Sequence, residues 1–149
     1  MIDWSKLAFN YTKTNTMVCA SYKEGKWGPV ESRTCDDITI SSLSAALHYG
    51  VECFEGLKAF NCKDGKIRIF RPDENAKRLI RSANYLGIAS PSEEMFVEMV
   101  KQVVLENKEF IPPYETRASL YIRPTLIGVD PQWGAKHSKE ALFPTMVAP

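Results

Sequence analysis

Two consecutive amphipathic helices, predicted at residues 73–87 and 90–108, constrain the fold of this chain more than any other feature. The first, DENAKRLIRSANYLG, repeats apolar residues at helical spacing and ends at Gly87, a residue that suits a helix C-terminus. The second, SPSEEMFVEMVKQVVLENK, opens with Ser90 as N-cap, Pro91 at the first helical position and Glu93 completing a capping box. Strand-like segments stand on both sides of this helical pair.

These strand-like segments favour hairpins. Residues 17–22 and 27–31 flank a Lys-Glu-Gly-Lys turn, and ECFEGLKAFNC is joined to KIRIF through Asp64-Gly65, which supplies the positive φ angles of a tight turn. After the helices, residues 119–128 and 141–149 read as two further strands across a Gly- and Pro-containing connection. The predicted fold class is therefore α+β, an antiparallel sheet with two consecutive helices.

Arg123 lies inside a segment, SLYIRPTLIG, that otherwise resembles a buried strand. Because side chains alternate along a strand, the even-numbered residues 120–126 form one apolar face, and Tyr121 and Arg123 share the other. A guanidinium held there normally pairs with a carboxylate or a phosphate. From this strand alone an internal salt bridge is favoured over a ligand contact, because paired arginines are commoner than substrate clamps.

Composition and charge exclude several classes of function. The chain has 149 residues, which fits one globular domain. Its 19 Lys+Arg and 18 Asp+Glu give a net charge of +1, so no strong electrostatic field would attract nucleic acid or acidic membranes. No apolar window approaches a membrane span, and the N-terminus is not typical of a signal peptide. The four cysteines show no C-x-x-C pattern, which argues against a metal site or a disulfide framework and favours a cytoplasmic protein.

Around LHYGVECFEGLKAF, residues 47–60, each polar residue has a structural interpretation. His48 has no Ser, Cys or Asp at the spacing of a catalytic partner, so it is interpreted as structural. Glu52 and Glu55 would face opposite sides of a strand, which argues against a catalytic carboxylate pair. Arg78 lies about 130° from the apolar stripe of its helix, on a face expected to be solvated.

Three segments together resemble a known family: LHYGVECFEGLKAF, IRIFRPDENAKRLIRSANYLGI and SLYIRPTLIG. They are similar to the N-terminal small domain of branched-chain amino-acid aminotransferases, fold-type IV enzymes that use pyridoxal 5′-phosphate. The similarity extends in register from about Leu47 to Pro149. It implies a cytoplasmic transferase of amino-acid metabolism that moves an amino group between leucine, isoleucine or valine and 2-oxoglutarate, and that forms a homodimer when full length. Whether the direction is biosynthetic or degradative stays open.

The resemblance also implies roles for particular residues. Arg78 would bind the cofactor phosphate. Tyr49, Phe54, Tyr121 and Arg123 would line the substrate side-chain pocket, and Arg123 would receive the γ-carboxylate of glutamate when that amino donor is bound. One pocket would then accept both an aliphatic side chain and a carboxylate.

Two features depart from the family pattern. Trp133 stands where the family usually carries leucine, in a loop that includes Ala135 and that reaches toward the partner's active site in the dimers. None of the four lysines from residue 101 to 139 lies in the context of the family's Schiff-base lysine, so no catalytic residue is assigned. Because the chain stops at Pro149 directly after an apolar strand, residues 1–149 are expected to be a truncated first domain that does not transaminate alone.

Two alternatives remain. Another fold-type IV enzyme, a D-amino-acid aminotransferase or an aminodeoxychorismate lyase, would share the fold, although the Tyr-x-Arg pattern of Tyr121 and Arg123 argues against it. A binding or dimerisation module without catalysis would retain the fold and lack the lysine.

Overall fold

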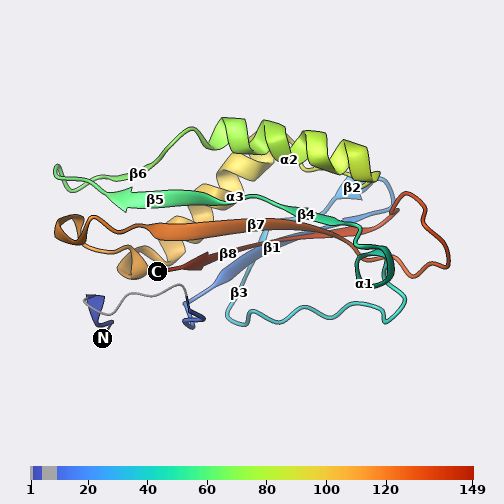
Figure 1. Cartoon of the computed structure of the whole chain (residues 1–149), viewed down its shortest axis with the longest axis horizontal. Helices are drawn as coiled ribbons and strands as arrows, with labels where there is room; N and C mark the ends of the chain where they lie inside the picture. The colour runs from blue at the N-terminus through green and yellow to red at the C-terminus, as the bar shows by residue number, and fades with distance from the viewer. Residues whose placement is uncertain (1, 5–9) are drawn as a thin grey trace.

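The computed structural model describes residues 2–4 and 10–149. In these residues, eight antiparallel strands form one sheet in the order β2-β1-β8-β7-β5-β6, with β3 beside β1 and β4 beside β7. The two long helices, α2 (Pro72–Leu86) and α3 (Glu93–Glu106), lie along the sheet as the second layer (Figure 1). The predicted α+β fold with two consecutive helices is confirmed.

The strands are short at the edges of the sheet and long at its centre. Their bounds are β1 (Met17–Lys23), β2 (Lys26–Trp27), β3 (Glu31–Arg33), β4 (Glu52–Phe54), β5 (Leu57–Asn61), β6 (Ile67–Ile69), β7 (Leu120–Gly128) and β8 (Ala141–Ala148). A short helix α1 (Ala45–Tyr49) precedes β4, and two 3-10 turns, η2 (Lys108–Phe110) and η3 (Tyr114–Thr116), connect α3 to β7.

The core lies between the helices and one face of the sheet. Five apolar side chains of α3 are buried there: Phe96, Met99, Val100, Val103 and Val104. From the sheet, β7 contributes the predicted even-numbered face and β8 contributes Phe143, which packs 6.0 Å from Phe96 between ring centroids. Neither α2 nor α3 covers the opposite face, where Tyr121 and Arg123 are only partly buried. In the described part of the chain, no helix is long and apolar enough to cross a membrane.

The start of α3 differs from the prediction. The N-cap is Ser92, whose side chain accepts a hydrogen bond from the backbone N–H of Met95 at 3.1 Å. Ser90, expected in this role, lies before the helix, and its carbonyl accepts a bond from the Trp27 indole at 2.9 Å. The predicted cap was therefore wrong by two residues, because the side chain that satisfies a free N–H of the first turn decides where the helix starts.

The long strand predicted for ECFEGLKAFNC is divided into β4 and β5. Both pair with β7 in one continuous register: Phe54 faces Thr125 and Leu57 faces Ile122, so Glu55 and Gly56 fall opposite residues 124 and 123. The Glu55 N–H donates to the Pro124 carbonyl at 2.9 Å. Proline has no N–H to return that bond, so the ladder is interrupted at this pair.

Candidate functional site

The candidate site lies on the sheet face that α2 and α3 leave uncovered, and Arg123 is its centre. The Nε of Arg123 donates a hydrogen bond to the hydroxyl of Tyr121 at 2.9 Å. Its guanidinium carbon lies 4.2 Å from the ring centroid of Phe54 and 5.2 Å from that of Tyr121. Contacts of this kind between a guanidinium and an aromatic face are attractive. Three of the predicted substrate-pocket residues are thus brought together across β4 and β7.

The internal salt bridge considered for Arg123 is not formed. Within residues 2–4 and 10–149, no ion pair includes this guanidinium. The remaining residues of the chain, 1 and 5–9, include no aspartate or glutamate in the sequence. The Arg123 guanidinium therefore contacts the rings of Phe54 and Tyr121 and the Tyr121 hydroxyl, without a carboxylate from the described sheet or helices.

Arg78 is anchored by a buried carboxylate. Its Nε and Nη2 donate to Oε1 and Oε2 of Glu55, both at 2.6 Å, and the Glu55 side chain is 3% exposed. Asn75, one turn earlier on α2, also donates to Oε2 at 2.8 Å. The hydrogen bonds and charge of Glu55 raise the pKa of Arg78.

This anchor leaves Arg78 available to a second anion. The side chain is 59% exposed, which confirms the solvated face predicted for it. A guanidinium has five N–H donors, and Glu55 receives bonds from two of its nitrogens. Glu55 and Asn75 were not predicted as partners of Arg78, although the spacing of three residues between Asn75 and Arg78 places both on one helix face.

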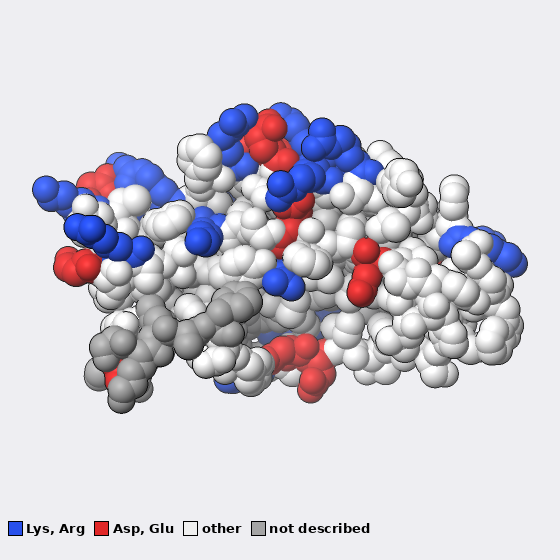
Figure 2. All heavy atoms as spheres, viewed as in Figure 1, with Lys and Arg blue, Asp and Glu red and all other residues white. Residues whose placement is uncertain are grey.

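Basic side chains gather around this position. Figure 2 shows Lys and Arg along the edge of the molecule where α2 lies, and the exposed basic residues of that helix are Lys77, Arg78 and Arg81. Lys77 is paired with Asp73 and Glu74 on the same helix, which offsets part of this positive charge. Arg78 thus combines a guanidinium fixed by Glu55 with an exposed side chain, an arrangement that can accept a second anionic group.

Tyr49 belongs to a second group, formed with the loop between β7 and β8. Its hydroxyl accepts a hydrogen bond from the backbone N–H of Gly134 at 2.6 Å. The neighbouring Trp133 is 71% exposed and lies edge-on to the His48 ring, with 6.0 Å between centroids. Ala135 follows in the same loop. The structure thus ties Tyr49 to this loop rather than to the group around Arg123.

His48 has the environment of a structural histidine. Its Nε2 lies 2.8 Å from the carbonyl oxygen of Ser42, and its ring contacts those of Tyr49 and Trp133. A ring nitrogen bonded to a main-chain carbonyl fixes the ring orientation. This arrangement agrees with the structural interpretation of His48.

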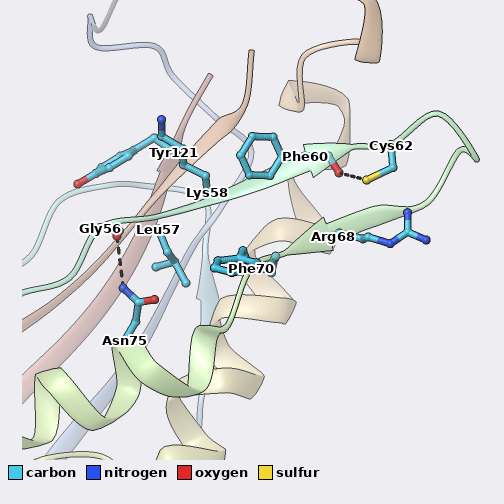
Figure 3. A pocket seen from close by; sticks show the side chains of 10 residues that line it. Gly56, Leu57, Lys58, Phe60, Cys62, Arg68, Phe70, Asn75 and Tyr121 are labelled. Carbon is cyan, nitrogen blue, oxygen red and sulfur yellow. Dashed lines mark hydrogen bonds between the residues drawn. The ribbon is translucent and has the colours of Figure 1, made fainter. Parts of the chain in front are cut away.

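Two hollows meet at Tyr121. The larger, of about 730 Å³, is mostly apolar and extends along β5 and β6 to the start of α2. Figure 3 shows Tyr121, Lys58 and Phe60 on one side of it, and Asn75 directed at the carbonyl of Gly56. The smaller hollow, of about 330 Å³, is lined by Tyr121, Arg123, residues 10–11 and residues 146–148.

The chain is similar in sequence to known proteins along nearly its whole length. No protein-family model matches it. The branched-chain-amino-acid aminotransferase of Haemophilus influenzae is 43% identical over 148 residues, which cover 99% of this chain and 43% of that protein. The protein of the same name from Helicobacter pylori is also 43% identical, over 99% of this chain and 44% of that protein. The chain therefore spans less than half the length of these relatives.

Comparison of the fold with solved structures leads to the same family. The solved structure of the branched-chain amino acid aminotransferase from Escherichia coli superposes with a TM-score of 0.62 and 26% identity, and covers 92% of this chain and 41% of that one. By sequence and by fold, this chain belongs to the family of the branched-chain-amino-acid aminotransferases and has the fold of their N-terminal domain.

Proposed function

We propose that residues 1–149 form the N-terminal small domain of a branched-chain aminotransferase. Joined to the remaining part of such an enzyme, the domain would help transfer an amino group between leucine, isoleucine or valine and 2-oxoglutarate. The observation that carries the proposal is Arg123, held against Phe54 and Tyr121 with no carboxylate partner in the described chain. The names of the relatives support the same activity.

The arrangement around Arg123 suits both kinds of substrate. Aliphatic side chains of branched-chain amino acids would pack on the apolar faces of Phe54 and Tyr121. The distal carboxylate of glutamate or 2-oxoglutarate would accept hydrogen bonds from the guanidinium, which provides charge and a planar fork of donors. One surface then serves both halves of the reaction, because the charged group lies beside apolar walls.

Pyridoxal 5′-phosphate is the proposed cofactor, and Arg78 is its proposed phosphate ligand. The fit rests on this chain's own residues: Glu55 fixes the guanidinium from the buried side, and the exposed side retains N–H donors for a phosphate. When bound, the pyridoxal group supplies an electron sink for charge that develops at the amino acid's Cα. The role of this domain is then to bind and orient the phosphate and the substrate side chain.

Partners and location are also part of the proposal. Small amino and 2-oxo acids would be its ligands, with no nucleic acid or membrane partner, in a cytoplasmic homodimer. The loop with Trp133 and Ala135 would contact the partner subunit's pocket. Two observations support this contact: Trp133 is 71% exposed, and the Tyr49 hydroxyl accepts a hydrogen bond from the backbone N–H of the adjacent Gly134.

A chimera tests this function. Residues 1–149 would replace the matching part of the Haemophilus influenzae relative, and the purified chimera would be assayed with 2-oxoglutarate and each branched-chain amino acid. We expect transfer from L-leucine, L-isoleucine and L-valine, and none from D-alanine. Circular dichroism and gel filtration would establish that the chimera is folded. A folded chimera that binds the cofactor and does not use any branched-chain amino acid would contradict the proposal.

A further inference from the structure

Gly56 lies under the ring of Tyr121. A Cβ atom at residue 56 would come within 2.6 Å of the Tyr121 hydroxyl oxygen and within 3.2 Å of two of its ring carbons. Real Cβ atoms essentially never approach another heavy atom to less than 3.0 Å. Tyr121 therefore occupies the space of the missing side chain, and Figure 3 shows both residues at the edge of the larger hollow.

The sheet register places Gly56 directly opposite Arg123. Because Phe54 faces Thr125 and Leu57 faces Ile122, residue 56 pairs with residue 123. Residues paired across antiparallel strands project their side chains to the same face. A side chain at residue 56 would thus enter the surface where the Arg123 guanidinium rests on Phe54.

Backbone conformation does not explain this glycine. Its φ angle lies outside the left-handed region in which five other glycines of the described chain are found. Alanine at residue 56 would therefore meet no unfavourable φ angle, and the obstacle is the contact with Tyr121. Because that contact is with the far end of a side chain, the ring would move while the sheet stays in place.

From this geometry we propose that Gly56 is a positioning residue for substrate selection. The absence of a side chain at residue 56 lets the Tyr121 ring lie across the backbone between β4 and β5. In that pose the Tyr121 hydroxyl accepts the bond from Nε of Arg123, at 2.9 Å. Gly56 thereby sets the direction in which the guanidinium presents its remaining donors, and with it the preference for substrates that carry a distal carboxylate. The selectivity part of this inference rests on the proposed function.

The positioning part is tested on the 149-residue chain without any catalytic readout. NMR would follow the side-chain Nε–H resonance of Arg123, assigned by its loss in Arg123→Met. We expect Gly56→Ala to shift this resonance and to increase its exchange with water. Gly28→Ala is the matched control, because Gly28 also lies outside the left-handed region and a Cβ there would meet its nearest atom at 3.4 Å. An unchanged Arg123 resonance in folded Gly56→Ala would overturn the inference, whatever the activity of the enzyme.

The selectivity part is tested in the chimera with the Haemophilus influenzae relative. We expect Gly56→Ala to lower the ratio of kcat/KM for glutamate to kcat/KM for leucine by about tenfold, and Gly28→Ala to leave it unchanged. Tyr121→Phe should lower the same ratio, and adding Gly56→Ala to it should have little further effect, because both changes remove the same Tyr121–Arg123 bond. The selectivity role would be overturned if Gly56→Ala lowered kcat/KM equally for glutamate and leucine, or if the effects of Gly56→Ala and Tyr121→Phe on the ratio were fully additive. A wild-type chimera with neither activity would refute the proposed function and the selectivity role with it, while the NMR result decides the positioning role.

Discussion

Replacing Arg78 by alanine should lower the stability of the domain as well as its affinity for an anion. Glu55 is 3% exposed, and both of its carboxylate oxygens accept bonds from Arg78 at 2.6 Å. Without the guanidinium, a buried charge retains only the bond from Asn75 at 2.8 Å. A buried acceptor without its partner is costly, because its desolvation is no longer compensated.

The size of the loss follows from the geometry. Leaving a buried hydrogen-bonding group unsatisfied costs about 1 to 3 kcal/mol, and more when the group is charged. Because the Arg78 side chain is 59% exposed, water can enter the space that alanine leaves and solvate part of the carboxylate. We therefore expect the free energy of unfolding to fall by about 2 kcal/mol in Arg78→Ala.

Urea denaturation of the 149-residue chain measures this loss, with the midpoint compared at constant m-value. The double variant Arg78→Ala, Glu55→Gln is the control, since a neutral amide removes the unpaired charge. It should recover about half of the lost stability, on the order of 1 kcal/mol. If Arg78→Ala were as stable as the wild type, or if Glu55→Gln made the double variant still less stable, the anchoring role of Glu55 would be refuted.

Three further changes have defined outcomes. Ser92→Ala removes the side-chain cap of α3 and should lower the free energy of unfolding by about 1 kcal/mol, measured by urea denaturation. Tyr49→Phe removes the acceptor of the Gly134 N–H, so amide hydrogen exchange at Gly134 should become faster while the sheet amides stay protected. Two hydrogen bonds from Arg68 lower the pKa of Asp64 to about 2, below its ordinary value of 3.8. The contribution of Asp64 to stability is therefore present above about pH 4 and is lost as the pH falls toward 2. Asp64→Asn should therefore flatten the stability profile over this range, and an identical profile in the variant would contradict the assignment.

Periodicity predicted the elements that are long enough to show it. The apolar faces of α2 and α3 and the alternation along β7 were all identified from the sequence, because each extends over several repeats of its period. Helix α1 was missed, since five residues do not complete a helical pattern. The division between β4 and β5 was also missed, because its cause is Pro124 on the neighbouring strand.

The site was predicted only in part for a similar reason. Tyr121 and Arg123 belong to one strand, so alternation placed them on one face, and the structure agrees. Glu55 and Arg78 are 23 residues apart on different layers, and no local pattern joins them. The importance of Gly56 likewise depends on the register between β4, β5 and β7. Contacts of this kind are set by tertiary packing, which a single sequence does not display.

Arg123 is proposed to receive the distal carboxylate of the amino donor, and Arg123→Met in the chimera tests this role directly. Single-turnover kinetics with glutamate and with leucine would be measured beside a urea denaturation curve. We predict that kcat/KM for glutamate falls roughly tenfold to a hundredfold, as expected for the loss of a charged hydrogen bond, while kcat/KM for leucine is nearly unchanged. Stability should change little, because no carboxylate of the described chain loses a partner. Equal losses for glutamate and leucine, accompanied by a large loss of stability, would show that Arg123 is structural and would contradict the claim.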